Sequence, residues 1–216
     1  MSNRKKFYIN GSWVQPSTDA TLDVINPATE EVIDQVAMGG EPDVNAAVES
    51  AYDAFESFSQ TTREDRIELL SKIIEVYKSR IPDVAAQISE EMGAPKGLAA
   101  AAQAPAGLGH FMTTLSVLKD YEFEQDLGKS RVIREPAGVC AFITPWNWPI
   151  NQIACKVAPA MAAGCTMVLK PSEVAPFNAV LFAEIMDEAG VPPGIFNLVN
   201  GDGPPCLLYT SPSPRD

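Results

Sequence analysis

The alternation of short apolar runs with helical stretches between residues 139 and 199 constrains this chain most strongly. Val139–Ile143 is a short continuous apolar run, as expected of a strand that is buried on both faces, Thr166–Leu169 is a second buried strand, and Ile195–Val199 is a third strand. The stretches between them, Asn151–Ala163 and Phe177–Ala189, have helical character, and a glycine follows each. Strand, helix, strand, helix and strand at this spacing predict an α/β fold with a Rossmann-like, doubly wound parallel sheet.

A β-hairpin and a layer of helices are expected ahead of this unit. Asn10–Gly11 is a turn signal between two short apolar segments, which is typical of a hairpin. Strands are expected at Phe7–Asn10, Ser12–Val14, Leu22–Ile25, Val32–Ala37 and, exposed, at Lys129–Arg134. Helices are expected at Asp43–Phe58, Asp83–Met92 and Gly97–Lys119. A further helix is expected to begin at the capping box Thr61-x-x-Glu64, and its apolar stripe is Ile67, Leu70, Ile73, Ile74 and Tyr77. Pro105 is expected to begin, kink or divide the last of these helices.

Charge and hydropathy argue against nucleic-acid binding and against a membrane-spanning segment. The chain has 16 basic and 28 acidic side chains, a net charge of -12, so non-specific nucleic-acid binding through clustered cations is not expected. No apolar run approaches the ~20 residues of a membrane span. The basic segment Met1–Lys6 precedes a β-like segment rather than an apolar signal core, so a cytoplasmic protein is predicted.

The cysteines and the single histidine do not form a recognisable metal or disulfide pattern. None of the four cysteines belongs to a CxxC or CxxxC pair, and His110 is the only histidine. Without a secretion signal, a disulfide framework is not expected, and no metal site is predicted. Cys140, Cys155 and Cys165 are interpreted as small apolar residues of a packed core.

Candidate functional residues stand in the loops that follow the predicted parallel strands. These loops are Thr144–Pro149, Lys170–Glu173 and Asn200–Gly203. Ligands of such sheets bind outside the carboxyl ends of the strands, so the loops are expected to face one crevice. The third loop is the weakest indication, because Cys206 stands where a GxGxxG motif would have its last glycine.

Several candidate side chains have two interpretations. Asn147, held between prolines and tryptophans, either donates its amide N–H to a developing negative charge or caps the following helix. Lys170 and Glu173 either contact a phosphate and the hydroxyls of a ribose or form a solvated ion pair. Lys156 is either partly buried, with a lowered pKa or a carboxylate partner, or extends to the surface.

Beyond these patterns, the chain resembles the N-terminal part of the NAD(P)-dependent aldehyde dehydrogenase superfamily. The resemblance extends from about Phe7 to Gly203. It rests on FYINGSWV, VINPATEEVI and PAGVCAFITPWNWPINQIACKVAPAMAAGCTMVLKPSEVAP, and the combination of PWNWP with KPSE is its most specific part. It implies an oxidoreductase parent that oxidises an aldehyde to a carboxylic acid through a thiohemiacetal on a cysteine that this chain lacks.

The same resemblance implies roles for individual residues. Asn147 matches the asparagine of the oxyanion hole, and Lys156 matches the lysine of a proton relay. Cofactor-binding positions are matched by Ile143, Thr144, Pro145, Trp146, Lys170, Pro171, Ser172 and Glu173. A glutamate at position 173 favours NAD, because it would repel a 2′-phosphate, although NADP is possible. Residues 121–136 match part of an oligomerisation segment, so a homo-oligomeric parent is expected.

Departures from the family pattern set the expected boundaries. The nucleophilic cysteine and general-base glutamate of the family lie beyond Gly203, and no cysteine here stands in the nucleophile motif. Residues 1–203 are therefore expected to be the N-terminal part of a cofactor-binding domain. The ending CLLYTSPSPRD resembles a translated sequencing adapter, so residues 204–216 are expected to be a non-native tail rather than a natural disordered one. The alternative function is a catalytically inactive nucleotide-binding or oligomerisation fragment.

Overall fold

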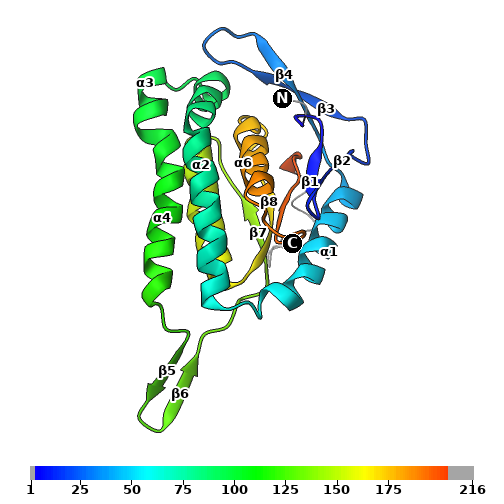
Figure 1. Cartoon of the computed structure of the whole chain (residues 1–216). Helices are drawn as coiled ribbons and strands as arrows, with labels where there is room; N and C mark the ends of the chain where they lie inside the picture. Colours follow the sequence, from blue (N-terminus) through cyan, green and yellow to red (C-terminus); the bar gives the residue numbers. More distant parts are fainter. Residues whose placement is uncertain (1–2, 204–216) are drawn as a thin grey trace, which may run out of the picture.

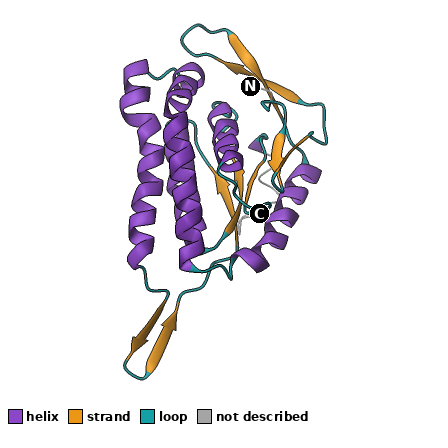
Figure 2. Cartoon of the chain, in the orientation of Figure 1, coloured by secondary structure: helices purple, strands orange, loops and turns teal. Residues whose placement is uncertain are grey.

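The central feature of the fold is a five-stranded sheet with the order β2-β1-β9-β8-β7. The computed structural model describes residues 3–203, so the tail predicted at 204–216, Cys206 included, lies outside the described residues. The strands are β1 (Phe7–Ile9), β2 (Ser12–Val14), β7 (Val139–Ile143), β8 (Thr166–Lys170) and β9 (Phe196–Leu198). Helices cover both faces of this sheet (Figures 1 and 2).

The predicted strand–helix unit is confirmed. β7, β8 and β9 pair in parallel, with Val139 opposite Thr166 and Leu169 opposite Leu198. Helix α5 (Pro149–Ala163) connects β7 to β8, and α6 (Phe177–Glu188) connects β8 to β9. Gly164, directly after α5, adopts φ +85, a conformation that favours glycine.

The expectation that Val139–Ile143 is buried on both faces is wrong for β7. Thr166–Leu169 of β8 is buried throughout, as predicted, but the residues of β7 are half-buried or exposed. Ile143 is 44% exposed. The reason is position, because β7 is the edge strand of the sheet and pairs only with β8 within residues 3–203.

The N-terminal hairpin is part of the main sheet. β1 and β2 pair in antiparallel fashion around Asn10 and Gly11, which have φ angles of 52° and 70°. Tyr8 pairs with Leu198, which adds the hairpin to β9. The buried side chain of Asn197 fixes this junction, since its Oδ1 accepts from the Asn10 N–H at 3.0 Å.

A second hairpin and helix α1 follow the N-terminal hairpin in the chain. β3 (Thr21–Ile25) and β4 (Val32–Ala37) form a separate two-stranded sheet, as the sequence predicts. α1 (Glu41–Phe58) packs Val44 and Ala47 against Val168 of the main sheet. This packing forms a second apolar cluster, separate from the main core.

The helix predicted after Thr61 and the helix predicted at Asp83–Met92 form one continuous helix. α2 (Arg63–Met92) is a continuous helix of 30 residues with Pro82 inside it. Buried side chains on both sides of the proline, Tyr77 and Val84, belong to the same core, and Arg80 also pairs with Asp83 on α2 and Glu184 on α6. Its N-cap is Thr62 rather than Thr61, because the Thr62 hydroxyl accepts from the Asp65 N–H at 3.1 Å.

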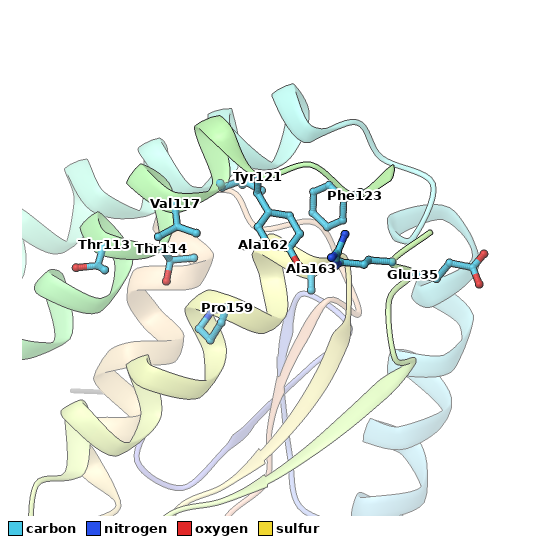
Figure 3. A pocket seen from close by; sticks show the side chains of 11 residues that line it. Thr113, Thr114, Val117, Tyr121, Phe123, Glu135, Pro159, Ala162 and Ala163 are labelled. Carbon is cyan, nitrogen blue, oxygen red and sulfur yellow. The ribbon is translucent and has the colours of Figure 1, made fainter. Parts of the chain in front are cut away.

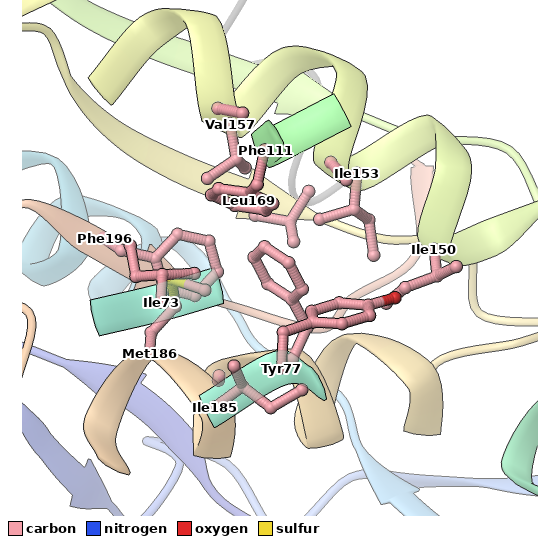
Figure 4. Packing of buried hydrophobic residues seen from close by; sticks show 14 of the residues in the cluster. Ile73, Tyr77, Phe111, Ile150, Ile153, Val157, Leu169, Ile185, Met186 and Phe196 are labelled. Atoms are coloured by element: carbon pink, nitrogen blue, oxygen red, sulfur yellow. The ribbon is translucent and has the colours of Figure 1, made fainter. Parts of the chain in front are cut away.

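The remaining helices pack on α2 and α5. Lys96–Leu98 (α3) leads into a π-helical segment, Ala99–Gln103 (η1), and then into α4 (Ala104–Asp120). Pro105 lies in the first turn of α4 and so begins that helix, one of the predicted possibilities. Side chains from α2, α4, α5, α6 and the sheet form the main core, which Figure 4 shows around Tyr77 and Phe111.

A small hairpin extends from the end of α4, away from the body of the molecule (Figure 1). It consists of β5 (Glu124–Leu127) and β6 (Ser130–Ile133). The sequence predicts only the second of these strands, because the acidic residues of β5 lack an apolar alternation. No helix within residues 3–203 has the length and apolar character that a membrane crossing requires.

Candidate functional site

The loops after the parallel strands lie side by side at the carboxyl edge of the sheet. The Thr144 N–H donates to the Lys170 carbonyl at 3.2 Å, which joins the first loop to the second. The Val199 N–H donates to the Leu169 carbonyl at 3.0 Å, so the third loop begins at the same level. The strand pattern predicts this arrangement, and the main-chain hydrogen bonds produce it.

The first loop presents Asn147 to solvent. Thr144 is buried at the start of the loop, whereas Trp146 is 53% exposed and Asn147 is exposed. The N-cap residue of α5 is Trp148, and no side-chain hydrogen bond caps this helix. The interpretation of Asn147 as a helix cap is therefore wrong, because the helix begins one residue too late for it.

The second loop contains an ion pair that is sheltered from solvent on one side. Lys170 Nζ lies 3.1 Å from Glu173 Oε2, with side-chain exposures of 13% and 37%. Partial burial acts to raise the pKa of Glu173, but hydrogen bonds from its own backbone N–H and from Lys170 lower the pKa overall. Pro171 is buried, and the Ser172 hydroxyl accepts from the Val174 N–H at 3.2 Å. The loop therefore holds a cation and an ionised carboxylate in fixed positions.

Lys156 lies on α5, half-buried, with partners on its own helix. Its ammonium donates to the Gln152 carbonyl at 2.9 Å and to Gln152 Oε1 at 3.2 Å. The carboxylate partner considered for a buried lysine is not found among the described residues. Within residues 3–203, the hydrogen-bond partners of the Lys156 ammonium are Gln152 and Cys155, and Asn147 is not among them.

The third loop adds two residues that sequence reasoning did not single out. Asn200 is 1% exposed. The negative charge of Asp202 acts to raise the pKa of Glu173, although this pKa is lowered overall. The carbonyl of Asn200 accepts from the Gly39 N–H at 2.8 Å. The sequence signal that could have identified Asn200 is its position directly after the third predicted strand.

The chemistry of this edge fits a dinucleotide. Lys170 and Glu173 place a cation and a carboxylate at this edge, the groups that phosphates and ribose hydroxyls require of a binding site. Asn200 adds a buried amide whose Oδ1 and Nδ2 have no hydrogen-bond partner within residues 3–203. Most buried polar atoms have a hydrogen-bond partner, so this amide is an exception among the described residues.

A cavity of about 430 Å³ lies elsewhere, at the far end of α5. Its lining includes Val117, Tyr121, Phe123 and Ala162 (Figure 3). Trp148, at the beginning of α5, belongs to the carboxyl edge, whereas Ala162 is near the end of the helix. The cavity is therefore separate from the three loops.

The fold and this edge define a Rossmann-like α/β protein with loops suited to a nucleotide. The sequence model of the aldehyde dehydrogenase family matches residues 13–209. The chain belongs to the aldehyde dehydrogenase family.

Individual relatives agree with this assignment. A 3-succinoylsemialdehyde-pyridine dehydrogenase of a Pseudomonas species is 58% identical over 205 residues, which cover 94% of this chain and 43% of the relative. A solved mutant of aldehyde dehydrogenase C from Pseudomonas syringae, complexed with NAD+ and octanal, has a TM-score of 0.93 and 48% identity over 95% of this chain and 42% of its own. A betaine aldehyde dehydrogenase from Staphylococcus aureus in complex with NAD+ has a TM-score of 0.88 and 33% identity, and covers 93% of this chain and 41% of its own. The chain spans about 43% of the length of the first curated relative.

Proposed function

We propose that this chain forms the cofactor-binding part of an NAD-dependent enzyme that oxidises an aldehyde to a carboxylic acid. The observation that carries the proposal is the hydrogen bond between Thr144 and Lys170, which brings two loops of different chemistry to one edge. Residues 1–203 would be the N-terminal part of the cofactor-binding domain. The cysteine nucleophile and general-base glutamate would lie in the part of the relatives that this chain does not span.

The loops provide a coherent set of cofactor contacts. Residues 143–146 and 170–173 would line the dinucleotide, with Lys170 on a phosphate or hydroxyl and Glu173 on the hydroxyls of the adenosine ribose. The ionised Glu173 repels a 2′-phosphate, which favours NAD, and NADP would be the poorer cofactor. When bound, the nicotinamide supplies an acceptor for hydride. The NAD+ complexes of the solved relatives support this cofactor.

Asn147 and Lys156 are the proposed catalytic residues of this part of the enzyme. The exposed Asn147 would donate its amide N–H to the aldehyde oxygen as negative charge develops there. A single donor of this type lowers a barrier by roughly 2.7–4 kcal/mol. Lys156, whose ammonium is held by Gln152, would take part in proton transfer.

Residues 121–136 are proposed as part of an interface between identical subunits in the cytoplasm. β5 and β6 form an isolated ribbon, and two-stranded hairpins of this kind are marginally stable alone. Leu127 and Ile133 on this ribbon are 57% and 58% exposed. Packing against a second copy would bury both side chains.

One alternative has an observation in its favour. A chain that spans about 43% of a relative is also consistent with an inactive nucleotide-binding or oligomerisation fragment. NAD binding at micromolar concentration by the 216-residue chain, without NADH formation, would favour that alternative for the isolated chain. Formation of NADH therefore distinguishes an active dehydrogenase from an inactive binding or oligomerisation fragment.

The decisive experiment adds the part of a relative that this chain does not span. Residues 1–203 are joined to the downstream part of the Pseudomonas relative, and NADH formation is measured with a panel of aldehydes. We expect aldehyde-dependent NADH formation, and calorimetry should detect NAD binding. A folded fusion protein that neither binds NAD nor forms NADH would contradict the proposal.

A further inference from the structure

The ammonium of Lys156 is held in one place by groups of its own helix. It donates to the Gln152 carbonyl at 2.9 Å, to Gln152 Oε1 at 3.2 Å and to Cys155 Sγ at 3.7 Å. A lysine ammonium has three N–H donors and no acceptor, so these contacts engage all three donors. Lysine side chains commonly extend until the charged end reaches water. The half-buried Lys156 instead folds back along α5 toward the beginning of the helix.

Two lysines on the surface of α2 differ from Lys156 in both partner and exposure. The Lys72 side chain is 58% exposed and pairs with Glu68, and the Lys78 side chain is 47% exposed and pairs with Glu75. Lys156 has the neutral amide of glutamine as its partner. A neutral partner suits a group that releases and takes up a proton, because transfer of the proton leaves no unpaired carboxylate in a half-buried place.

Gln152 stands between Lys156 and the proposed oxyanion donor. Trp148 is the N-cap of α5, so Asn147 occupies the position before the cap and Gln152 the fourth position of the helix. Side chains at these two positions commonly pack against each other. The Gln152 N–H donates to the Trp148 carbonyl at 2.9 Å, which fixes the backbone of this turn. Gln152 therefore holds the Lys156 ammonium on the part of α5 that adjoins Asn147.

We propose that Gln152 is a positioning residue, whose side chain holds the Lys156 ammonium near the reacting aldehyde for proton transfer. The inference rests on the proposed function, in which Lys156 takes part in proton transfer and Asn147 donates to the aldehyde oxygen. The Gln152 carbonyl also accepts in the main-chain ladder of the helix, whereas Oε1 serves the lysine alone among residues 3–203. Oε1 accepts hydrogen bonds and carries no proton, so its effect on the rate passes through Lys156.

The test is a double-mutant cycle in the fusion protein, built from Gln152→Met, Lys156→Met and the variant with both substitutions. We expect Lys156→Met to lower kcat by about 10²-fold or more, as loss of a proton-transfer group does. Gln152→Met should lower kcat about tenfold, because the lysine is then poorly placed. The double variant should be no slower than Lys156→Met, since without the lysine Gln152 has nothing to position. NAD affinity should be the same in the wild type and the three variants.

A second measurement follows the Lys156 amine itself and does not depend on activity. Brief acetylation with acetic anhydride, read by mass spectrometry of the peptide that contains Lys156, reports how freely this amine reacts. Gln152→Met should raise the labelling rate about two- to tenfold, the range that loss of one hydrogen bond spans. Asn151→Leu is the matched control and should leave this rate unchanged, because the neighbouring half-buried amide contacts His110 at 2.8 Å instead.

Each remaining outcome separates the inference from the proposed function. Additive losses of kcat in the double variant would overturn the inference, because Gln152 would then act on the fold rather than through Lys156. Wild-type kcat and labelling in Gln152→Met would also overturn it, and a slow Lys156→Met would leave the proposed function intact. Wild-type kcat in Lys156→Met would remove Lys156 from the proposed function and the inference with it. Gln152→Ala, with the same expected results, replaces Gln152→Met if methionine prevents folding.

Discussion

A Cβ atom at Gly107 of α4 would overlap the hydroxyl of Tyr77 on α2. The Tyr77 hydroxyl donates to the Ala104 carbonyl at 2.9 Å, so the ring cannot move aside without losing a buried hydrogen bond. We expect Gly107→Ala to lower the free energy of unfolding by about 1–3 kcal/mol, as overpacking does. Urea denaturation measures this change.

Gly109 on the same helix is the control for that substitution. Nothing lies within 4 Å of a Cβ built there. Gly109→Ala should therefore raise the free energy of unfolding, by up to about 1 kcal/mol, because alanine favours helix more than glycine does. Equal destabilisation by both substitutions would contradict the close contact with Tyr77.

The carboxylate of Glu91 makes stability depend on pH. Glu91 is buried and accepts from the N–H groups of Phe177 and Asn178, both at 2.7 Å, at the start of α6. Burial raises the pKa of Glu91 from 4.5 to about 7, although these hydrogen bonds act to lower it. The folded state therefore binds more protons than the unfolded state between these values, and the contribution of Glu91 to stability falls as pH rises from about 4.5 to about 7.

Urea denaturation at a series of pH values tests this dependence. Glu91→Gln should reduce the loss of stability between pH 4.5 and 7, since the amide does not titrate. Glu90→Gln, at the partly exposed neighbouring position, should retain the wild-type slope. A wild-type slope in the Glu91 variant would show that another group is responsible.

Asn147→Ala tests the proposed oxyanion donor. In the fusion protein, kcat should fall by about 10²–10³, because the donor acts on charge that develops in the transition state. NAD affinity should be unchanged, since Asn147 is not among the proposed cofactor contacts. Pre-steady-state measurement of NADH formation isolates the chemical step, and an unchanged rate of that step would remove Asn147 from the mechanism.

Glu173→Gln tests the proposed choice between cofactors. Removing the negative charge should improve kcat/KM for NADP relative to NAD by about tenfold or more, because a like-charge contact with the 2′-phosphate is relieved. The pKa of Glu173 is lowered, so the repulsion should be present at and above neutral pH and weaken as the carboxylate protonates in acid. A ratio that does not change would place the 2′-position away from Glu173.

Local patterns predict the parallel unit well because each element carries its own signal. β8 shows this clearly: an apolar run between a helix-ending glycine and Lys-Pro is buried on both faces. The same reasoning fails for β7, whose apolar run lies at an edge, because strand order is a property of the whole sheet. The continuous α2 was missed for a related reason, since Tyr77 and Val84, on either side of Pro82, pack into one core that several elements form together.

The sequence predicts where the candidate site lies, but it does not predict the hydrogen bonds within the site. The loops of Thr144 and Lys170 follow predicted strands, so their proximity followed from parallel pairing. The unpaired amide of Asn200 was not predictable, because the hydrogen bonding of a buried side chain depends on groups from elements that are remote in sequence. The N-cap of α5 at Trp148 likewise required backbone geometry.

The edge position of β7 has a consequence for handling the protein. Its outer N–H and C=O groups have no strand partner within residues 3–203, and an open edge of this kind templates pairing with another strand. Association between copies is a second-order process, whereas completion of a sheet by the same polypeptide is first-order. Recovery of monodisperse material after refolding should therefore decline as the starting concentration is raised, and dilution should restore it.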